Sequence, residues 1–248
     1  MSALERKPAK RRIDQLLVER GLAESRERAQ ALILAGYVRA EGRKIEKPGQ
    51  TVSDTADIEL TQRLRYVSRG GLKLEGAIRQ FGIEVAGRIC LDIGSSTGGF
   101  TDCLLQHGAA RVYAFDVGTG QLDWKLRNDP RVVVREGVNA RYLQPADLPE
   151  PVDLAVCDVS FISVTHILPV LPPLLRSPAA LVILIKPQFE AGRDQVGRGG
   201  IVRDPAVHAE ICARIKAAVE SLGFRTALME SPILGAEGNR EFLLYATN

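Results

Sequence analysis

The chain has 248 residues, of which 45% are hydrophobic and 25% charged, a composition typical of a globular protein. Its longest apolar runs have the length of a strand, which excludes a membrane span, and its charged N-terminus lacks the apolar core of a secretory signal. The net charge of +3 is unevenly spread, because residues 1–65 carry 14 Lys and Arg against 10 Asp and Glu, whereas the rest carries 19 against 20.

The N-terminal quarter predicts a small basic module. We expect a mobile tail at 1–12, helices at 13–20 and 26–34, and strands at 37–40 and 58–60. Ser25 is the expected N-cap of the second helix, and Gly21 and Gly36 end the two helices. A basic surplus on such a module favours a nucleic-acid partner, and a solvated surface is the alternative.

This order of elements, with the segments Ser25–Ala29 and Leu34–Ala40, resembles the alpha-L RNA-binding motif, also called the S-four domain. The resemblance implies that residues 1–65 form an RNA-binding domain. Its cations would contact phosphates, which gives affinity without sequence preference. The candidate RNA-binding side chains are Lys10, Arg11, Arg12, Arg26, Arg28, Arg39, Arg43 and Lys44.

Residues 66–248 alternate strand and helix patterns after a flexible turn at Ser68–Gly71 and a helix that begins at Leu72. We expect strands at 89–91, 112–115, 132–135, 154–157, 181–185, 226–229 and 242–245, and helices at 100–107, 160–175 and 205–222. Repeated units of this kind predict an α/β fold with a doubly wound, mostly parallel sheet, whose ligands bind beyond the C-terminal strand ends. The last two strands are expected to form an antiparallel hairpin at the edge.

A glycine-rich turn follows the first of these strands, from Asp92 to Gly99. Ser96 stands where a dinucleotide loop needs its second glycine, and Phe100 follows where a phosphate loop needs Lys. Instead, the spacing Asp-x-Gly-x-x-x-Gly-Gly resembles the first motif of S-adenosylmethionine (SAM) methyltransferases. An ordinary strand-to-helix turn is the alternative.

Two polar residues at later strand ends extend this candidate cofactor site. Asp116 lies about 20 residues past the loop, where an acid can bind the ribose diol of any adenosine-containing cofactor, and Asn139 could face the adenine. The alternatives are a solvated carboxylate for Asp116 and a turn residue for Asn139. Trp124 could form an adenine wall or pack in a helix, and we expect packing. The candidate SAM-binding residues are Asp92, Gly94, Ser95, Ser96, Gly98, Gly99, Asp116 and Asn139.

Asp158 ends the fourth strand without the Pro-Pro-Tyr/Phe that accompanies methylation of base amines. Cys157 is expected to point into the sheet, which disfavours it as the nucleophile of cytosine carbon methylation. The four cysteines, which also include Cys90, Cys103 and Cys212, form no C-x-x-C pair, so we expect buried thiols in a reducing cytoplasm and no structural zinc. Lys186 ends the fifth strand and, taken alone, would be a surface lysine.

Lys73 and Glu241 join Asp158 and Lys186 in a set that matches the Lys-Asp-Lys-Glu tetrad of ribose 2′-O-methyltransferases. With the glycine loop and the N-terminal module, the whole chain resembles the TlyA/haemolysin A family of rRNA 2′-O-methyltransferases, whose catalytic domain is FtsJ-like (RrmJ-like). The resemblance implies a Rossmann-like domain at 66–248 that uses SAM, without a metal, to methylate a ribose of ribosomal RNA, on cytidine, in the cytoplasm. Its partners would be ribosomal RNA or ribosomal subunits and no membrane.

A ribose hydroxyl is a poor nucleophile, so methyl transfer needs a base, and a lysine serves as one only where burial and a neighbouring cation favour its neutral form. We interpret Lys186 as this base, Asp158 as its orienting group, and Lys73 and Glu241 as groups that position the substrate or tune the base. The glycines and arginines of 192–203 suggest either a lid over RNA or a plain surface loop. Two other functions remain open: a cytolytic protein, and a non-catalytic ribosome-binding or assembly factor.

Overall fold

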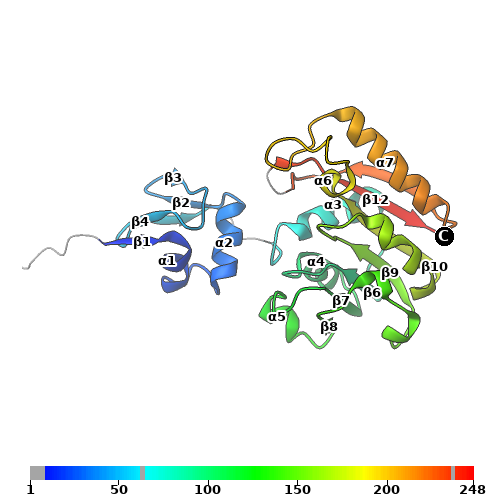
Figure 1. The fold of residues 1–248 in the computed structure, drawn as a ribbon. Helices are drawn as coiled ribbons and strands as arrows, with labels where there is room; N and C mark the ends of the chain where they lie inside the picture. The colour runs from blue at the N-terminus through cyan, green and yellow to red at the C-terminus, as the bar shows by residue number, and fades with distance from the viewer. Residues whose placement is uncertain (1–8, 62–64, 236–237) are drawn as a thin grey trace, which may run out of the picture. The chain divides into compact units, whose positions relative to one another are not determined.

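The computed structural model describes residues 9–61, 65–235 and 238–248, which fall into two compact units, Met1–Arg69 and Gly70–Asn248 (Figure 1). Residues 1–8, which are most of the predicted N-terminal tail, and residues 62–64 lie outside the described residues. The described end of that tail, Lys10–Arg12, is a strand, so the prediction of a mobile segment is wrong there.

The first unit contains two helices and five short strands. These are β1 (Lys10–Arg12), α1 (Ile13–Glu19), α2 (Arg26–Leu34), β2 (Val38–Ala40), β3 (Arg43–Lys44), β4 (Thr51–Ser53) and β5 (Ile58–Leu60). β1 pairs with β4, and β2 lies between β3 and β5, all antiparallel. The expected N-cap is confirmed, because the Ser25 hydroxyl accepts a hydrogen bond from the Arg28 amide at 3.2 Å. Ile13, Leu17 and Ile33 form part of the core that joins the helices to the strands.

The second unit is built on one seven-stranded sheet. Its strands are β6 (Ile89–Ile93), β7 (Arg111–Phe115), β8 (Val132–Arg135), β9 (Val152–Cys157), β10 (Leu175–Ile185), β11 (Arg225–Glu230) and β12 (Phe242–Thr247), in the order β11-β12-β10-β9-β6-β7-β8. The five strands from β10 to β8 are parallel. β12 is antiparallel to both β10 and β11, which confirms the mostly parallel sheet and its edge hairpin.

The α-helices of this unit are α3 (Gly70–Phe81), α4 (Gly99–Gln106), α5 (Trp124–Arg127), α6 (Pro187–Glu190) and α7 (Pro205–Glu220). Short 3₁₀ turns, η1 (Ala140–Tyr142) and η2 (Pro145–Asp147), follow β8. α3 begins at Gly70, so the predicted flexible turn at Ser68–Gly71 is wrong in its second half. Both glycines there belong to the first turn of the helix.

The helix predicted at 160–175 is wrong. The segment consists of three 3₁₀ turns, η3 (Val164–His166), η4 (Leu168–Val170) and η5 (Pro172–Leu174). Proline has no backbone N–H and its ring collides with the preceding turn, so Pro169, Pro172 and Pro173 prevent a continuous α-helix. The apolar residues of this segment still lie on one face of the turns, and that face is buried.

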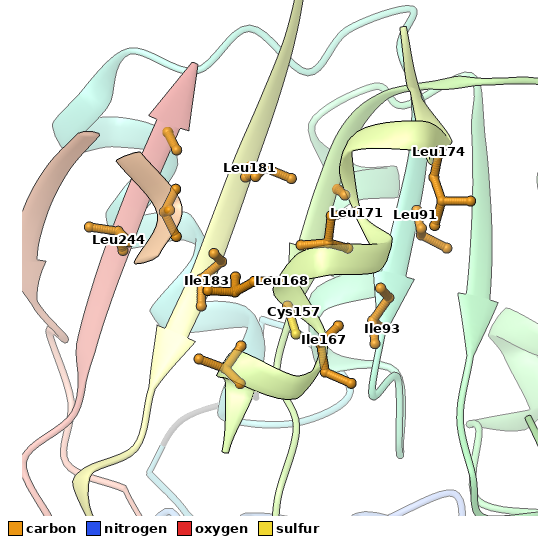
Figure 2. Packing of buried hydrophobic residues seen from close by; sticks show 14 of the residues in the cluster. Leu91, Ile93, Cys157, Ile167, Leu168, Leu171, Leu174, Leu181, Ile183 and Leu244 are labelled. Atoms are coloured by element: carbon orange, nitrogen blue, oxygen red, sulfur yellow. The ribbon is translucent and has the colours of Figure 1, made fainter. Parts of the chain in front are cut away.

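That buried face belongs to the main core of the second unit (Figure 2). Ile167, Leu168 and Leu171 lie beside Leu181 and Ile183 of β10 and near Ile93 of β6, as Figure 2 shows. Burial of such side chains contributes roughly 1.5–3 kcal/mol each. The core therefore anchors the C-terminal end of the loop that follows β9.

All four cysteines are buried and free, as the sequence predicts. In the described part of the chain, no helix combines the length and the apolar character that a membrane crossing needs.

Candidate functional site

A cavity of about 530 Å³ lies where β6, β7 and β9 end. These strands are parallel, and β6 lies between the other two, so their carboxyl ends meet at one edge of the sheet. The walls come from four segments that follow strand ends: Ile93–Ser96, Phe115–Gln121, Val138–Arg141 and Asp158–Ile162. This is the edge at which a ligand is expected in an open α/β sheet.

The glycine-rich turn forms one wall of the cavity and packs tightly against its neighbours. Gly94 has a φ of +81°, and a Cβ on it would lie 2.4 Å from the carbonyl oxygen of Asp158. Gly98 has a φ of +96° and lies against the Leu126 side chain. Only glycine fits such positions without displacing its neighbours. The turn therefore brings backbone to the cavity where a side chain would not fit.

Asp116 fixes the turn from the end of β7. Its Oδ2 accepts a hydrogen bond from the Ser96 amide, and its Oδ1 accepts one from the Gly118 amide, each at 2.7 Å. A carboxylate has about four acceptor positions, so two remain for hydroxyl donors in the cavity. Asn139 also lines the cavity, although its Oδ1 accepts from the Arg141 amide at 3.2 Å and so caps η1.

The candidate cofactor residues divide into two groups. Gly94, Ser96, Asp116 and Asn139 line the cavity, whereas Asp92, Ser95, Gly98 and Gly99 are not among the described lining residues. Asp92 is fully buried, and its Oδ2 accepts a hydrogen bond from Thr101 Oγ1 at 2.6 Å. Burial raises the pKa of Asp92 to about 7. The Asp92 Oδ1 has no hydrogen-bond partner among the described residues.

The four tetrad residues form two ion pairs. Lys186 follows β10 and Asp158 follows the adjacent β9, so the sheet brings Lys186 Nζ to 2.5 Å from Asp158 Oδ1. This contact is an ion pair without hydrogen-bond geometry, whereas Lys186 Nζ donates a hydrogen bond to Ser160 Oγ at 2.8 Å. Asp158 and Ser160 both line the cavity, and Lys186, which contacts both of them, is not itself among the described lining residues.

The second pair joins α3 to the residue before β12. Lys73 Nζ donates to Glu241 Oε2 at 2.5 Å, and the two side chains are 11% and 2% exposed. Loss of one partner from a buried ion pair of this kind strongly destabilises the folded protein, because the other charge stays buried and unpaired. Neither Lys73 nor Glu241 is among the described residues that line the cavity.

Cys157 is buried in the main core, as predicted, and its burial raises the pKa of its thiol. A neutral thiol packed among apolar side chains is not a nucleophile. The expectation for Trp124 is wrong, because this side chain is 78% exposed at the start of α5 and does not pack against the protein.

Three residues near the site were missed by the sequence analysis. Ser160 binds Lys186, Phe161 lines the cavity and is 90% exposed with a φ of +64°, and Glu190 is buried beneath the loop after β9. A positive φ is unusual for an aromatic residue. Ser160 and Phe161 stand beside Asp158 in the sequence, which could have singled them out, but nothing in the sequence around Glu190 distinguishes it from a surface acid.

In the first unit, the candidate RNA-binding residues differ in what holds them. Arg12 donates to both oxygens of the fully buried Asp14, at 3.0 and 2.9 Å, and Arg26 Nε donates to Asp14 Oδ2 at 2.9 Å. The hydrogen bonds from Arg12 hold the pKa of Asp14 well below its usual range. Both guanidiniums remain nearly half exposed.

The other candidate cations are distributed over α2 and the strands. Arg11 pairs with Glu19, Arg28 Nη1 donates to the Tyr66 carbonyl at 2.6 Å, and Arg39 Nη1 donates to the Gly42 carbonyl at 3.3 Å. Lys10, Arg43 and Lys44 are exposed on β1 and β3.

Two family models match the chain. Residues 66–248 match the FtsJ-like methyltransferase model, and residues 11–58 match the S4 domain. A Bacillus subtilis protein provisionally named rRNA methyltransferase YqxC is 53% identical, over 95% of this chain and 85% of its own length. The 16S/23S rRNA (cytidine-2'-O)-methyltransferase TlyA of Mycobacterium tuberculosis is 49% identical, over 94% and 88%. A solved structure from Streptococcus thermophilus, provisionally named a hemolysin, has a TM-score of 0.77 and 46% identity, over 97% and 89%.

Proposed function

The chain belongs to the FtsJ-like methyltransferase family, and we propose that it transfers a methyl group from SAM to a ribose 2′-hydroxyl of ribosomal RNA, on cytidine. The substrate class is supported by the relative named 16S/23S rRNA (cytidine-2'-O)-methyltransferase, which aligns with nearly the whole chain. The S4 domain match supports RNA as the partner of the first unit.

The cavity suits SAM in size and in chemistry. Its volume of about 530 Å³ is adequate for a ligand of this size, and pockets for such ligands typically have volumes of about 300–1,000 Å³. The Gly94 backbone leaves no room for a Cβ, and the Asp116 carboxylate has acceptor positions to spare for a ribose diol. Gly94, Ser96, Asp116 and Asn139 would hold the cofactor, which supplies a methyl group on a sulfonium with a neutral thioether as the leaving group.

The observation that carries the proposal is the contact of the Lys186 amine nitrogen with Asp158 and Ser160, two residues that line the cavity. We assign Lys186 as the general base: its ammonium first releases a proton to solvent, and the neutral amine then takes the proton of the 2′-hydroxyl as the oxygen attacks the methyl carbon. Asp158 and Ser160 orient its Nζ, and Asp158 can hold the proton near the site after transfer through the same contact. A base placed within hydrogen-bond reach accelerates such a step by typically 10²–10⁴-fold.

The proposal is tested by single-turnover methylation of ribosomal RNA, with nuclease digestion and mass spectrometry of the nucleosides. We expect the unmodified enzyme to form 2′-O-methylcytidine. Lys186→Ala should form this product about 10²–10⁴-fold more slowly, with little change in SAM affinity. Lys186→Arg should fail too, because a guanidinium stays protonated. The exposed Lys216→Ala on α7 is the matched control.

Methylation on a base by the unmodified enzyme would contradict the ribose assignment. An active Lys186→Arg variant would contradict the role of Lys186 as the base and leave the methyltransferase activity in place.

A further inference from the structure

Glu190, the last residue of α6, carries a buried carboxylate that belongs to neither ion pair of the tetrad. Its side chain is 3% exposed. Oε2 accepts a hydrogen bond from Ser163 Oγ at 2.6 Å, and Oε1 accepts one from the Val164 amide at 2.7 Å. Hydrogen bonds to an ionised acceptor at these distances are among the strong ones in proteins. The carboxylate thus joins α6 to the start of η3.

The two segments that Glu190 joins are the ones that carry Lys186 and Asp158. The loop Asp158–Ile162 is held at its beginning by the Asp158 amide, which donates to the Ile93 carbonyl at 2.9 Å. It is held at its end, one residue later, by the contacts of Ser163 and Val164 with Glu190. Lys186 lies four residues before Glu190, as the N-cap residue of α6.

A buried carboxylate is retained only where its lone pairs and its charge are satisfied. Arg214 of α7 lies with Nη2 3.6 Å from Glu190 Oε2 and donates to the Glu190 backbone carbonyl at 2.6 Å. Because Arg214 is half exposed, solvent screens its charge, and the short hydrogen bonds to the loop hold the carboxylate in place. A displacement of that loop would therefore leave the Glu190 carboxylate buried without its hydrogen bonds, which is energetically unfavourable.

We propose that Glu190 is a positioning residue for methyl transfer: it keeps the loop Asp158–Ile162 in register with α6, so that Asp158 and Ser160 remain on Lys186 Nζ. This proposal rests on the function proposed above for Lys186. Glu190 acts through the loop, because its side chain contacts Ser163, Val164 and Arg214. A displacement of about 1 Å in a reacting group can lower a rate about 10²-fold.

The test compares Glu190→Ala with Glu190→Gln in the full chain. A glutamine amide can accept from the Val164 amide and donate to Ser163 Oγ, so it preserves the geometry without the charge. We expect Glu190→Ala to lower the single-turnover rate by roughly 10–100-fold and to shift its pH profile, with SAM affinity within about twofold. Glu190→Gln should retain most of the rate. Glu210→Ala, an exposed acid on α7, is the matched control.

A second readout does not depend on methylation. In reductive alkylation a neutral amine attacks an aldehyde, water leaves, and cyanoborohydride reduces the resulting imine, so an ammonium held by a carboxylate and a hydroxyl reacts slowly. Mass spectrometry should find Lys186 labelled faster in Glu190→Ala than in Glu190→Gln or the unmodified protein, with Lys216 as the internal reference. Inactivity of the unmodified enzyme on RNA would sink the proposed function, while this labelling would still test Glu190.

Three outcomes overturn the proposal: an unchanged rate in Glu190→Ala, equal losses in the alanine and glutamine variants, or unchanged Lys186 labelling in Glu190→Ala. If Glu190→Ala does not fold, as judged by circular dichroism, Ser163→Ala removes one of the two loop contacts and should give a smaller loss of rate with faster Lys186 labelling. An unchanged single-turnover rate and unchanged Lys186 labelling in Ser163→Ala would then overturn the positioning role of Glu190.

Discussion

Replacement of Gly94 by alanine should separate cofactor binding from folding. An alanine at a φ of +81° costs about 1–2 kcal/mol for the left-handed backbone alone. Its Cβ would also stand 2.4 Å from the Asp158 carbonyl oxygen, about 1 Å closer than an ordinary contact, and such overpacking typically costs about 1–3 kcal/mol. The total of about 2–5 kcal/mol is below the ~5–15 kcal/mol stability of a typical domain, so the variant should fold with a shifted turn.

Gly87→Ala is the matched control. Gly87 has a φ of +74° in the turn before β6, and a Cβ there would meet nothing within 4 Å. Gly87→Ala therefore has the strain of a left-handed backbone without a steric overlap. Calorimetry should show that Gly94→Ala weakens SAM binding at least about tenfold, which corresponds to about 1.4 kcal/mol. Gly87→Ala should bind SAM normally, although both variants melt at lower temperature.

The methylation rate of Gly94→Ala should fall further than its SAM affinity, because the displaced Asp158 carries the contact with Lys186. Equal SAM affinity in the two glycine variants would refute this reasoning and would mean that the cofactor binds away from the turn.

Three further predictions concern charge. Lys73→Met should lower the free energy of unfolding by about 3–5 kcal/mol in urea titrations, since it leaves Glu241 buried and unpaired, and the double variant with Glu241→Gln should lose less. Asp14, with its lowered pKa, should stabilise the protein fully above the unfolded value of about 3.9 and progressively less below it. Melting temperatures of Asp14→Asn should therefore converge on those of the unmodified protein as the pH falls below about 4. Lys44→Ala should reduce the slope of log Kd for RNA against log salt by about one, whereas Lys216→Ala should leave it unchanged.

The sheet was predictable because its strands carry their own signal. Val132–Arg135 and Ile58–Leu60 were bounded correctly from the sequence. The strand predicted at 37–40 begins one residue later, and the other predicted strands are longer than expected, β10 by six residues. β1, β3 and β4 were missed, since a strand of two or three residues has too little periodicity to be recognised and is defined by its partner. The failure at 160–175 has another cause: apolar spacing predicts which side chains are buried, but the prolines decide the backbone.

The candidate site was predictable only to the level of residue types at strand ends. Asp116, Asp158 and Lys186 could be placed there because parallel strands bring their carboxyl ends together. The division of the tetrad into two pairs and the contact of Ser160 with Lys186 depend on side-chain geometry that no spacing in the chain encodes. Glu190 is the extreme case, because its partners Ser163 and Val164 lie more than 25 residues away in the sequence.

Asp158 links the two halves of the chemistry. Its backbone carbonyl lies against Gly94, which belongs to the turn that forms the cofactor wall, and its carboxylate lies on Lys186. A shift of the glycine turn must therefore move the Asp158 backbone and, through it, the carboxylate that orients the base. In the mechanism proposed above, cofactor binding and base positioning are therefore coupled through Asp158, although Gly94 and Asp158 are 64 positions apart in the sequence. This coupling predicts that substitutions in the turn impair methyl transfer more than they impair SAM binding.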